Sequence, residues 1–126
     1  MAGKKILVVD DEQAILDVLE KKLSVDGYEV LTAATGRDAF EKARSHLPDL
    51  ILMDIVLPDI EGSVVVRNLQ YDQATQRIPV VFLTGIVSRD VGQKQTDITV
   101  GGREYRAIGK PFTYRELSDV IHKVLE

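Results

Sequence analysis

Near its start the chain reads Lys5-Ile6-Leu7-Val8-Val9-Asp10-Asp11, in which an unbroken apolar run, residues 6–9, is followed by two acidic residues. A strand that is apolar at every position, without alternation, is typical of a parallel sheet buried on both faces. Two further runs have the same form: residues 50–53 lead to Asp54, and residues 80–83 lead to Thr84. Residues 28–33 and 105–108 are weaker strand candidates.

Helical patterns lie between these strands. Residues 15–23 place their apolar side chains on one helix face, and residues 37–47 and 63–74 predict two more helices. A capping box, Thr113-x-x-Glu116, opens a last amphipathic helix. Strands that alternate with helices imply right-handed βαβ units. We therefore expect one α/β domain over residues 1–126, with a flavodoxin-like, doubly wound, five-stranded parallel sheet in the order 2-1-3-4-5.

The segment between Thr84 and Lys110 departs from this regular pattern. Residues 88–95 predict at most a short helix, because Gly92 in its middle weakens it. After it, alternating apolar residues, the pair Gly101-Gly102 and a second strand-like run are typical of a β-hairpin. We expect an irregular fourth helix region and a hairpin at residues 96–108. A flexible glycine-containing loop is the alternative.

Composition excludes several classes of protein. The net charge is −4 and the basic residues are dispersed, so we expect no direct contact with nucleic acid, which needs a basic face. A membrane span needs about 20 apolar residues, and the apolar runs here are far shorter. The chain has no cysteine, which excludes disulfides and thiolate zinc sites. We expect a cytoplasmic protein with no membrane partner.

Polar residues follow the three strongest strands where each one ends. Asp10 and Asp11 follow the first strand and Asp54 the second, while Thr84 and Lys110 end the last two parallel strands. In an open parallel sheet these ends meet at one rim. Three carboxylates that converge need a cation, and oxygen ligands without His or Cys favour Mg²⁺. Taken singly, each aspartate is more simply explained as a helix cap or turn residue.

The chain resembles the receiver domain of bacterial two-component response regulators, of the chemotaxis-receiver kind, over nearly its full length. The matching stretches are residues 6–12, residues 49–54 with Leu57-Pro58 and Gly62, residues 81–85, and Lys110-Pro111-Phe112.

The resemblance assigns a role to each residue at the rim. It implies that Asp54 accepts a phosphoryl group from a sensor histidine kinase or a phosphotransfer protein. It implies a Mg²⁺ site formed by Asp10, Asp11, Asp54 and the backbone carbonyl of Val56. Thr84 and Lys110 match the residues that bind the phosphoryl group, and the peptide bond before Pro111 is expected to be cis. Such a protein is a regulator that assists its own phosphorylation and slow dephosphorylation, not an enzyme, and it signals to a downstream protein or effector domain.

Two departures from the family pattern matter for switching. The tyrosine or phenylalanine that usually sits three residues before the lysine is replaced by Ala107, with Tyr105 on the same strand face. The segment from Thr84 to Lys110 is also longer than in the family. Our hypothesis is that this rebuilt segment, including the hairpin, is the moving output element.

The lifetime of the phosphorylated form depends on water that passes two side chains. These are Val56 and Ile86, which lie two residues after Asp54 and Thr84. Both are branched and apolar, and neither can orient an attacking water. We therefore predict slow dephosphorylation.

Three other functions are alternatives to this one. A receiver-like interaction module that no longer uses phosphorylation would explain Ala107, but not the intact rim residues. An aspartate-nucleophile phosphatase would carry an Asp-x-Asp arrangement after its first strand, in place of adjacent Asp10-Asp11. A flavodoxin-like cofactor carrier would need a phosphate loop there, and Asp10-Asp11-Glu12 would repel a phosphate without a metal.

Overall fold

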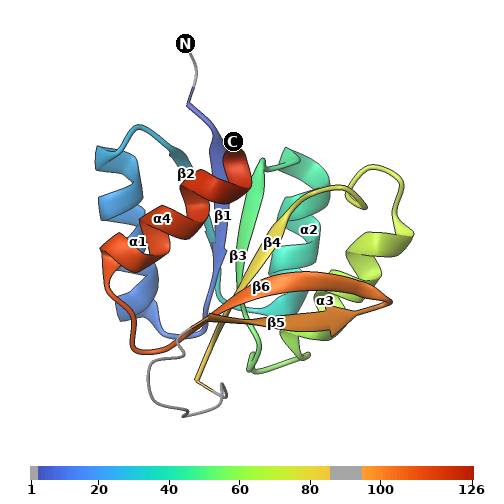
Figure 1. The fold of residues 1–126 in the computed structure, drawn as a ribbon. Helices are drawn as coiled ribbons and strands as arrows, with labels where there is room; N and C mark the ends of the chain where they lie inside the picture. Colours follow the sequence, from blue (N-terminus) through green and yellow to red (C-terminus); the bar gives the residue numbers. More distant parts are fainter. Residues whose placement is uncertain (1–2, 86–94) are drawn as a thin grey trace.

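A six-stranded sheet forms the centre of the computed structural model, which describes residues 3–85 and 95–126 (Figure 1). The strands lie in the order β2-β1-β3-β4-β6-β5. Their bounds are Lys5–Val9 (β1), Glu29–Ala33 (β2), Leu50–Asp54 (β3), Val80–Thr84 (β4), Gln95–Val100 (β5) and Arg103–Gly109 (β6). All neighbours pair in parallel except β5 and β6, which pair antiparallel. The predicted parallel order 2-1-3-4-5 is confirmed, with β6 as the fifth parallel strand and β5 added at the edge.

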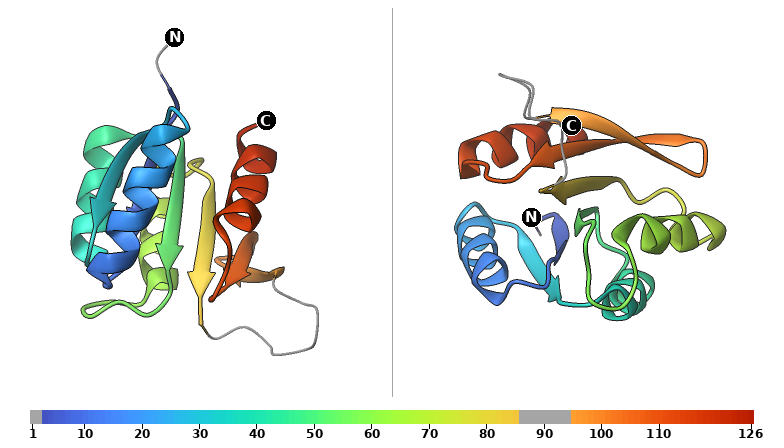
Figure 2. Two further views of the ribbon diagram at one scale, coloured as in Figure 1. Left: turned by 90° about the vertical axis from the view of Figure 1, so that its left-hand side faces the viewer. Right: turned by 90° about the horizontal axis from the view of Figure 1, so that it is seen from below.

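In the described part of the chain, four helices cover the two faces of this sheet. They are α1 (Gln13–Val25), α2 (Gly36–His46), α3 (Gly62–Tyr71) and α4 (Tyr114–Leu125). Figure 2, in its right-hand view, shows α1 and α4 on one side of the sheet and α2 and α3 on the other. Each pair closes its own apolar core, and every residue of β3 and β4 is buried. The unbroken apolar runs are therefore explained by helices on both faces.

The helix boundaries follow local signals in the sequence. Thr113 and Glu116 form the predicted capping box at the start of α4. Just after the C-terminal end of α1, Gly27 adopts a positive φ of 96°, a conformation that favours glycine. Helix α3 ends at Tyr71, three residues earlier than predicted. Among the described residues, no helix combines the length and the apolar character that crossing a membrane requires.

The predicted β-hairpin is present as β5 and β6. Its two strands pair in a regular register from Gln95 opposite Ile108 to Val100 opposite Arg103. Gly101 and Gly102 form the turn with positive φ values of 56° and 79°. The short helix considered for residues 88–95 falls, apart from Gln95 in β5, outside the described residues.

The hairpin is attached to α3 by a small polar network. The side-chain amide of Gln70 donates to the carbonyl of Val100 at 3.0 Å and to the hydroxyl of Tyr105 at 2.7 Å. The ring of Tyr105 packs edge-on against Phe82 of β4, with centroids 5.8 Å apart. A Cβ at Gly101 would meet Gln70 Oε1, so the glycine also permits close approach of the turn to α3. The hairpin, α3 and β4 therefore form one packed unit.

Candidate functional site

The carboxyl ends of β1, β3, β4 and β6 gather at one edge of the sheet, as the sequence predicts. Asp10 directly follows β1, Asp54 and Thr84 are the last residues of β3 and β4, and Lys110 directly follows β6. Strand register aligns these ends, since Thr84 pairs with Gly109, the residue before Lys110. Asp10, Asp54 and Thr84 are all buried. Polar side chains at the ends of apolar strands are therefore held in fixed positions within a largely desolvated rim.

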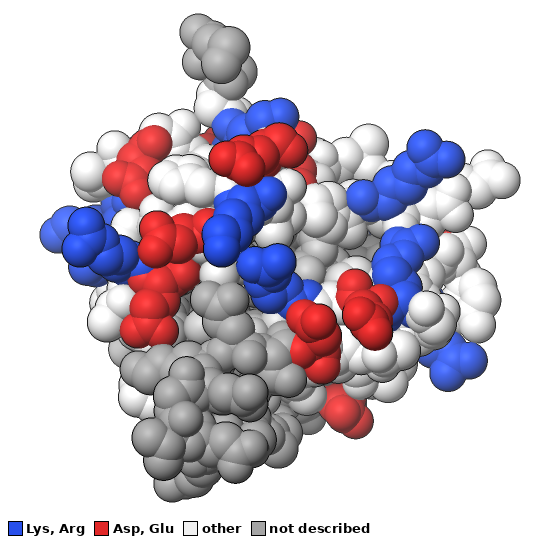
Figure 3. Space-filling model, in the orientation of Figure 1, with Lys and Arg blue, Asp and Glu red and all other residues white. Residues whose placement is uncertain are grey.

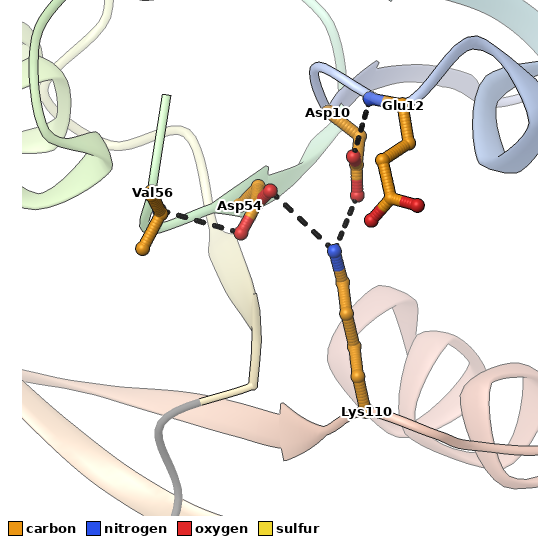
Figure 4. A network of polar contacts seen from close by, with 5 residues as sticks. All are labelled: Asp10, Glu12, Asp54, Val56 and Lys110. Carbon is orange, nitrogen blue, oxygen red and sulfur yellow. Dashed lines mark hydrogen bonds and ion pairs between the residues drawn. The ribbon is translucent and has the colours of Figure 1, made fainter. Parts of the chain in front are cut away.

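Lys110 joins two of the carboxylates. Its ammonium nitrogen Nζ donates to Asp10 Oδ2 at 2.7 Å and to Asp54 Oδ2 at 3.4 Å (Figure 4). The other oxygen of Asp10 accepts from the backbone N–H of Glu12 at 2.9 Å. The Lys110–Pro111 peptide is cis. The Lys110 ammonium thus contacts both the aspartate at the end of β1 and the aspartate at the end of β3.

Burial and neighbouring charges shift the pKa values of Asp54 and Lys110. Burial, and then the negative charge of Asp10, raise the pKa of Asp54, although Lys110 and the backbone N–H of Val56 oppose the rise. Burial by itself would lower the pKa of Lys110. The hydrogen bond to Asp10 and the charges of Asp10 and Asp54 outweigh burial and raise it. Lys110 is therefore a permanent cation at neutral pH.

The loop after Asp54 is held close to the end of β3. The N–H of Gly62 donates to the carbonyl of Ile55 at 2.7 Å, and a Cβ at Gly62 would lie 2.1 Å from the carbonyl oxygen of Asp54. Between these points Val56 is 58% exposed, and its N–H lies 3.4 Å from Asp54 Oδ1. Val56 is therefore the residue of this loop that faces solvent next to the carboxylate. Its predicted partner at the rim, Ile86, lies outside the described residues.

An acidic group that could hold a cation lies beside Asp54. Carboxylate oxygens of Asp10, Asp11 and Glu12 lie within 4.8 Å of one another, with Asp10 buried and the other two exposed. An all-oxygen set of this kind fits a hard cation such as Mg²⁺. Asp54 is linked to this group through Lys110 and, in the part of the chain that is described, is not itself within it.

Sequence reasoning did not assign Glu12 a place in the site. Its signal was present, because Glu12 is the third acidic residue in a row and stands at the N-cap of α1. The backbone N–H of Glu12 donates to Asp10, and the Glu12 carboxylate lies beside that of Asp10 (Figure 4). Glu12 is thus an additional candidate residue at this rim.

An apolar groove opens next to the site. Its walls come from the start of α1 and from the segment between β6 and α4, and it includes both Glu12 and Lys110. The lining residues are Glu12, Ala14, Ile15, Val18, Leu19, Lys110, Pro111 and Phe112. The groove thus places apolar surface beside the charged rim.

At the position where an aromatic residue was expected, the chain has Ala107. Ala107 is fully buried and pairs with Phe82 of β4, two residues before Thr84. The ring that packs on Phe82 is that of Tyr105, whose hydroxyl accepts a hydrogen bond from Gln70 on α3.

On the face shown in Figure 3, basic and acidic side chains are interspersed, and the described residues there form no continuous basic patch.

Comparisons with curated proteins agree on one family. The family model of the response regulator receiver domain matches residues 6–122. The alkaline phosphatase synthesis transcriptional regulatory protein PhoP of Bacillus subtilis is 36% identical over 123 residues, which is 98% of this chain and 49% of that protein. A probable transcriptional regulator ycf27 of Cyanophora paradoxa is 38% identical over 122 residues, 97% of this chain and 48% of that protein. The chain spans about half the length of these relatives.

Solved structures show the same fold. The receiver domain of the sensor histidine kinase PA1611 of Pseudomonas aeruginosa, which has a magnesium ion coordinated in its active site cleft, aligns with a TM-score of 0.81 at 27% identity, covering 98% of both chains. The chemotaxis protein CheY4 of Vibrio cholerae aligns with a TM-score of 0.80 at 30% identity, covering 98% of this chain and all of that one. With the rim geometry and the match over residues 6–122, the chain belongs to the response regulator receiver domain family.

Proposed function

We propose that this chain is a signalling switch that accepts a phosphoryl group on Asp54 with Mg²⁺ and then changes its interaction surface. The observation that carries the proposal is the position of the Asp54 carboxylate. It lies at the end of a buried strand, with the Lys110 ammonium at 3.4 Å and the acidic group of Asp10, Asp11 and Glu12 beside it. A nucleophile, a fixed cation and metal-binding oxygens are what phosphoryl transfer requires.

The transfer itself needs little proton chemistry. A carboxylate oxygen of Asp54 forms a bond to phosphorus while the bond from phosphorus to the donor, such as a histidine ring nitrogen, breaks. The electron pair of that bond stays with the donor nitrogen. Lys110 offsets the negative charge of the phosphoryl oxygens, and its raised pKa keeps it protonated throughout. The product is an acyl phosphate on Asp54.

Mg²⁺, when bound, would neutralise further charge on the phosphoryl oxygens. We assign its ligands to Asp11 and Asp54 and to the carbonyl of Val56, with Asp10 acting mainly through water. The ammonium of Lys110 holds Asp10 and Asp54 near each other. Lys110 would thereby keep the carboxylates of Asp10 and Asp54 close enough to serve one ion.

Switching in this chain would use the hairpin. Thr84 would move toward the phosphoryl oxygens. Its displacement would shift Phe82, which lies two residues earlier in β4, and with it Tyr105, whose ring packs on Phe82. Tyr105 is tied to α3 through Gln70, so the hairpin and α3 would respond together. Amide hydrogen exchange of residues 95–109, compared with and without beryllofluoride, tests this. Unchanged exchange over β5 and β6 would contradict it.

The proposed upstream partner is a sensor histidine kinase or a phosphotransfer protein, and the downstream partner is a separate protein or an effector domain. The donor's phosphoryl group must reach Asp54, and the apolar groove that includes Glu12 and Lys110 lies next to that route. We propose that the chain acts in the cytoplasm and serves as a phosphoacceptor, not as an enzyme with turnover of its own.

Incubation with acetyl phosphate and MgCl₂, followed by intact-mass measurement, tests the central claim. We expect the mass to rise by one phosphoryl group, and we expect no rise for Asp54→Asn or when EDTA replaces Mg²⁺. A wild-type chain that gains no mass would instead support the second candidate, a phosphorylation-independent interaction module. That candidate is favoured by one observation, the presence of Ala107 where the family usually has an aromatic residue.

A further inference from the structure

The first backbone N–H groups of α2 are bound by side chains from two different parts of the chain. The hydroxyl of Thr35, the N-cap residue, accepts from the N–H of Asp38 at 3.1 Å. The carboxylate of Asp59 accepts from the other two: Oδ1 from Gly36 at 2.8 Å and Oδ2 from Arg37 at 3.0 Å. These three groups have no partner within the helix. Thr35 binds one of them locally, whereas Asp59 binds two of them from 22 and 23 residues away in sequence.

Asp59 belongs to the loop that joins β3 to α3, five residues after Asp54. Its neighbour Ile60 packs so closely on α2 that a Cβ at Gly36 would lie 2.5 Å from Ile60 Cγ1. The far end of the loop is held at Gly62, whose N–H donates to Ile55. The loop that contains Val56 is therefore fixed to β3 at one end and to the N-terminus of α2 near its other end.

The charge of Asp59 strengthens this attachment. The N–H groups of Gly36 and Arg37 lower the pKa of Asp59, so the carboxylate is ionised at neutral pH. A negative charge at a helix N-terminus is also favoured by the helix dipole. Both carboxylate oxygens of Asp59 accept a hydrogen bond, so the orientation of the carboxylate is fixed as well as its position.

We propose that Asp59 is a positioning residue for the metal site: by fastening the β3–α3 loop to α2, it holds the Val56 carbonyl in place for Mg²⁺. This inference rests on the proposed function, because it concerns the ligand set assigned there. Asp59 does not touch the ion or the phosphoryl group. Its effect reaches them through Val56, three positions earlier in the same loop, so its loss weakens metal binding without removing any ligand.

Thr35 offers a matched control. Asp59→Ala and Thr35→Ala both remove caps from the same helix end, but only Asp59→Ala releases the loop. We would titrate each full-length variant and the wild type with MgCl₂ and follow amide NMR shifts of Asp11 and Val56, with thermal unfolding midpoints recorded in parallel. We expect Asp59→Ala to raise the Mg²⁺ dissociation constant roughly tenfold, as loss of outer-shell partners does, and Thr35→Ala to leave it unchanged.

Phosphorylation by acetyl phosphate gives a second readout. The rate for Asp59→Ala should be low at low MgCl₂ and return to the wild-type value at saturating MgCl₂, because the nucleophile and Lys110 are intact. Asp54→Asn should stay unreactive at any MgCl₂ concentration. A rate for Asp59→Ala that stays low at saturating MgCl₂ would overturn the inference.

Asp59→Asn keeps one acceptor oxygen and covers the case in which the alanine variant does not fold. It should raise the dissociation constant by less than alanine does, and a value equal to that of the wild type would overturn the proposal. If Asp59→Ala and Thr35→Ala change the Mg²⁺ dissociation constant equally, the proposal is also overturned, because Asp59 would then act only as a cap of α2. If the wild type shows no saturable shift with MgCl₂, the proposed metal site fails and the inference fails with it.

Discussion

The ammonium of Lys110 lies 2.7 Å from Oδ2 of Asp10, a residue one hundred positions earlier in the chain. Asp10 has no exposed surface, whereas the Lys110 side chain keeps 19% of its own. A buried carboxylate without a cation is costly, so this contact offsets the charge of the acidic rim before any metal arrives. The same contact ties the end of β6 to the end of β1 across the two strands between them.

Removal of the ammonium should therefore destabilise the protein in the absence of metal. In EDTA, we expect Lys110→Ala to lower the free energy of unfolding by about 3 kcal/mol, because it leaves Asp10 buried and without its cation. MgCl₂ should restore part of the loss by supplying another cation. Denaturant unfolding with and without MgCl₂ measures both effects.

Lys5→Ala is the control for this variant. Lys5 pairs with Glu29 at 3.8 Å on the surface, and such pairs contribute about 1 kcal/mol or less. Its loss should not depend on MgCl₂. Equal, metal-independent losses for both lysines would show that the rim does not need Lys110 for charge compensation.

The stability of the metal-free protein should depend on the protonation of Asp54. Burial and the charge of Asp10 raise the pKa of Asp54 in the folded state. The stabilisation that its proton contributes is present below the ordinary aspartate pKa of about 3.9 and is lost as the pH rises through the higher folded value. Asp54→Asn should therefore unfold at a higher temperature than the wild type at pH 7 in EDTA, and the difference should vanish at low pH. Thermal scans over this pH range test the prediction.

Asp59→Asn should change the stability at pH 7 in the opposite direction to Asp54→Asn. Hydrogen bonds from Gly36 and Arg37 lower the pKa of Asp59, so its contribution to stability is present above the ordinary aspartate pKa and is lost as the pH falls through the folded value. This variant should be less stable than the wild type at pH 7 and should approach it in acid. Changes of the same sign for both asparagine variants would contradict the electrostatic account.

The phosphorylated form should decay slowly because the apolar side chain of Val56 lies beside Asp54, where water would approach the phosphoryl group. Val56 is 58% exposed beside Asp54, and a branched alkyl group cannot orient a water molecule. Val56→Asn together with Ile86→Glu should shorten the half-life of the acyl phosphate roughly tenfold, since polar groups can position the attacking water. Intact-mass time courses after removal of acetyl phosphate give the half-life. Val64→Asn, at an exposed valine of α3, should leave it unchanged.

The hydroxyl of Tyr105 should matter more to the hairpin than to the core. Tyr105→Phe keeps the edge-on contact with Phe82 but removes the oxygen that accepts from Gln70. We expect a loss of about 1 kcal/mol in unfolding free energy and faster amide exchange in β5 and β6. Tyr71→Phe is the control, because that tyrosine is 75% exposed. Exchange rates in the hairpin that do not change would show that the hydrogen bond between Gln70 and the Tyr105 hydroxyl does not hold it.

Much of the fold could be predicted because its signals are local. An apolar run such as residues 6–9 predicts a buried strand wherever it occurs, and the residue after it must stand at the strand's end. The capping box at Thr113 and the glycine pair at residues 101–102 act within a few residues of themselves. These features place Asp10, Asp54, Thr84 and Lys110 at one rim without knowledge of any side-chain contact.

Contacts between distant segments could not be predicted in the same way. The link from Asp59 to the first turn of α2 and that from Tyr105 to Gln70 join residues 22 to 35 positions apart. Each depends on how a loop or hairpin packs against a helix, and no pattern around Asp59 or Gln70 distinguishes it from an ordinary surface residue. Glu12 differs from these two, because the run of three acidic residues indicates it in the sequence and the structure adds that the three carboxylates lie close together.

The amino-acid sequence alone determined the layered α/β fold and the polar residues that stand at the strand ends, because these follow from hydrophobic period and from residue types at turns. It indicated the hairpin with a loop as the alternative, and the structure decided between them. Only the tertiary structure decided which side chains meet: that Lys110 bridges Asp10 and Asp54, that the ring of Tyr105 packs edge-on against Phe82, and that Asp59 binds the start of α2. The physical reason is that strand register and helix packing set distances between side chains, and both are properties of the whole folded chain.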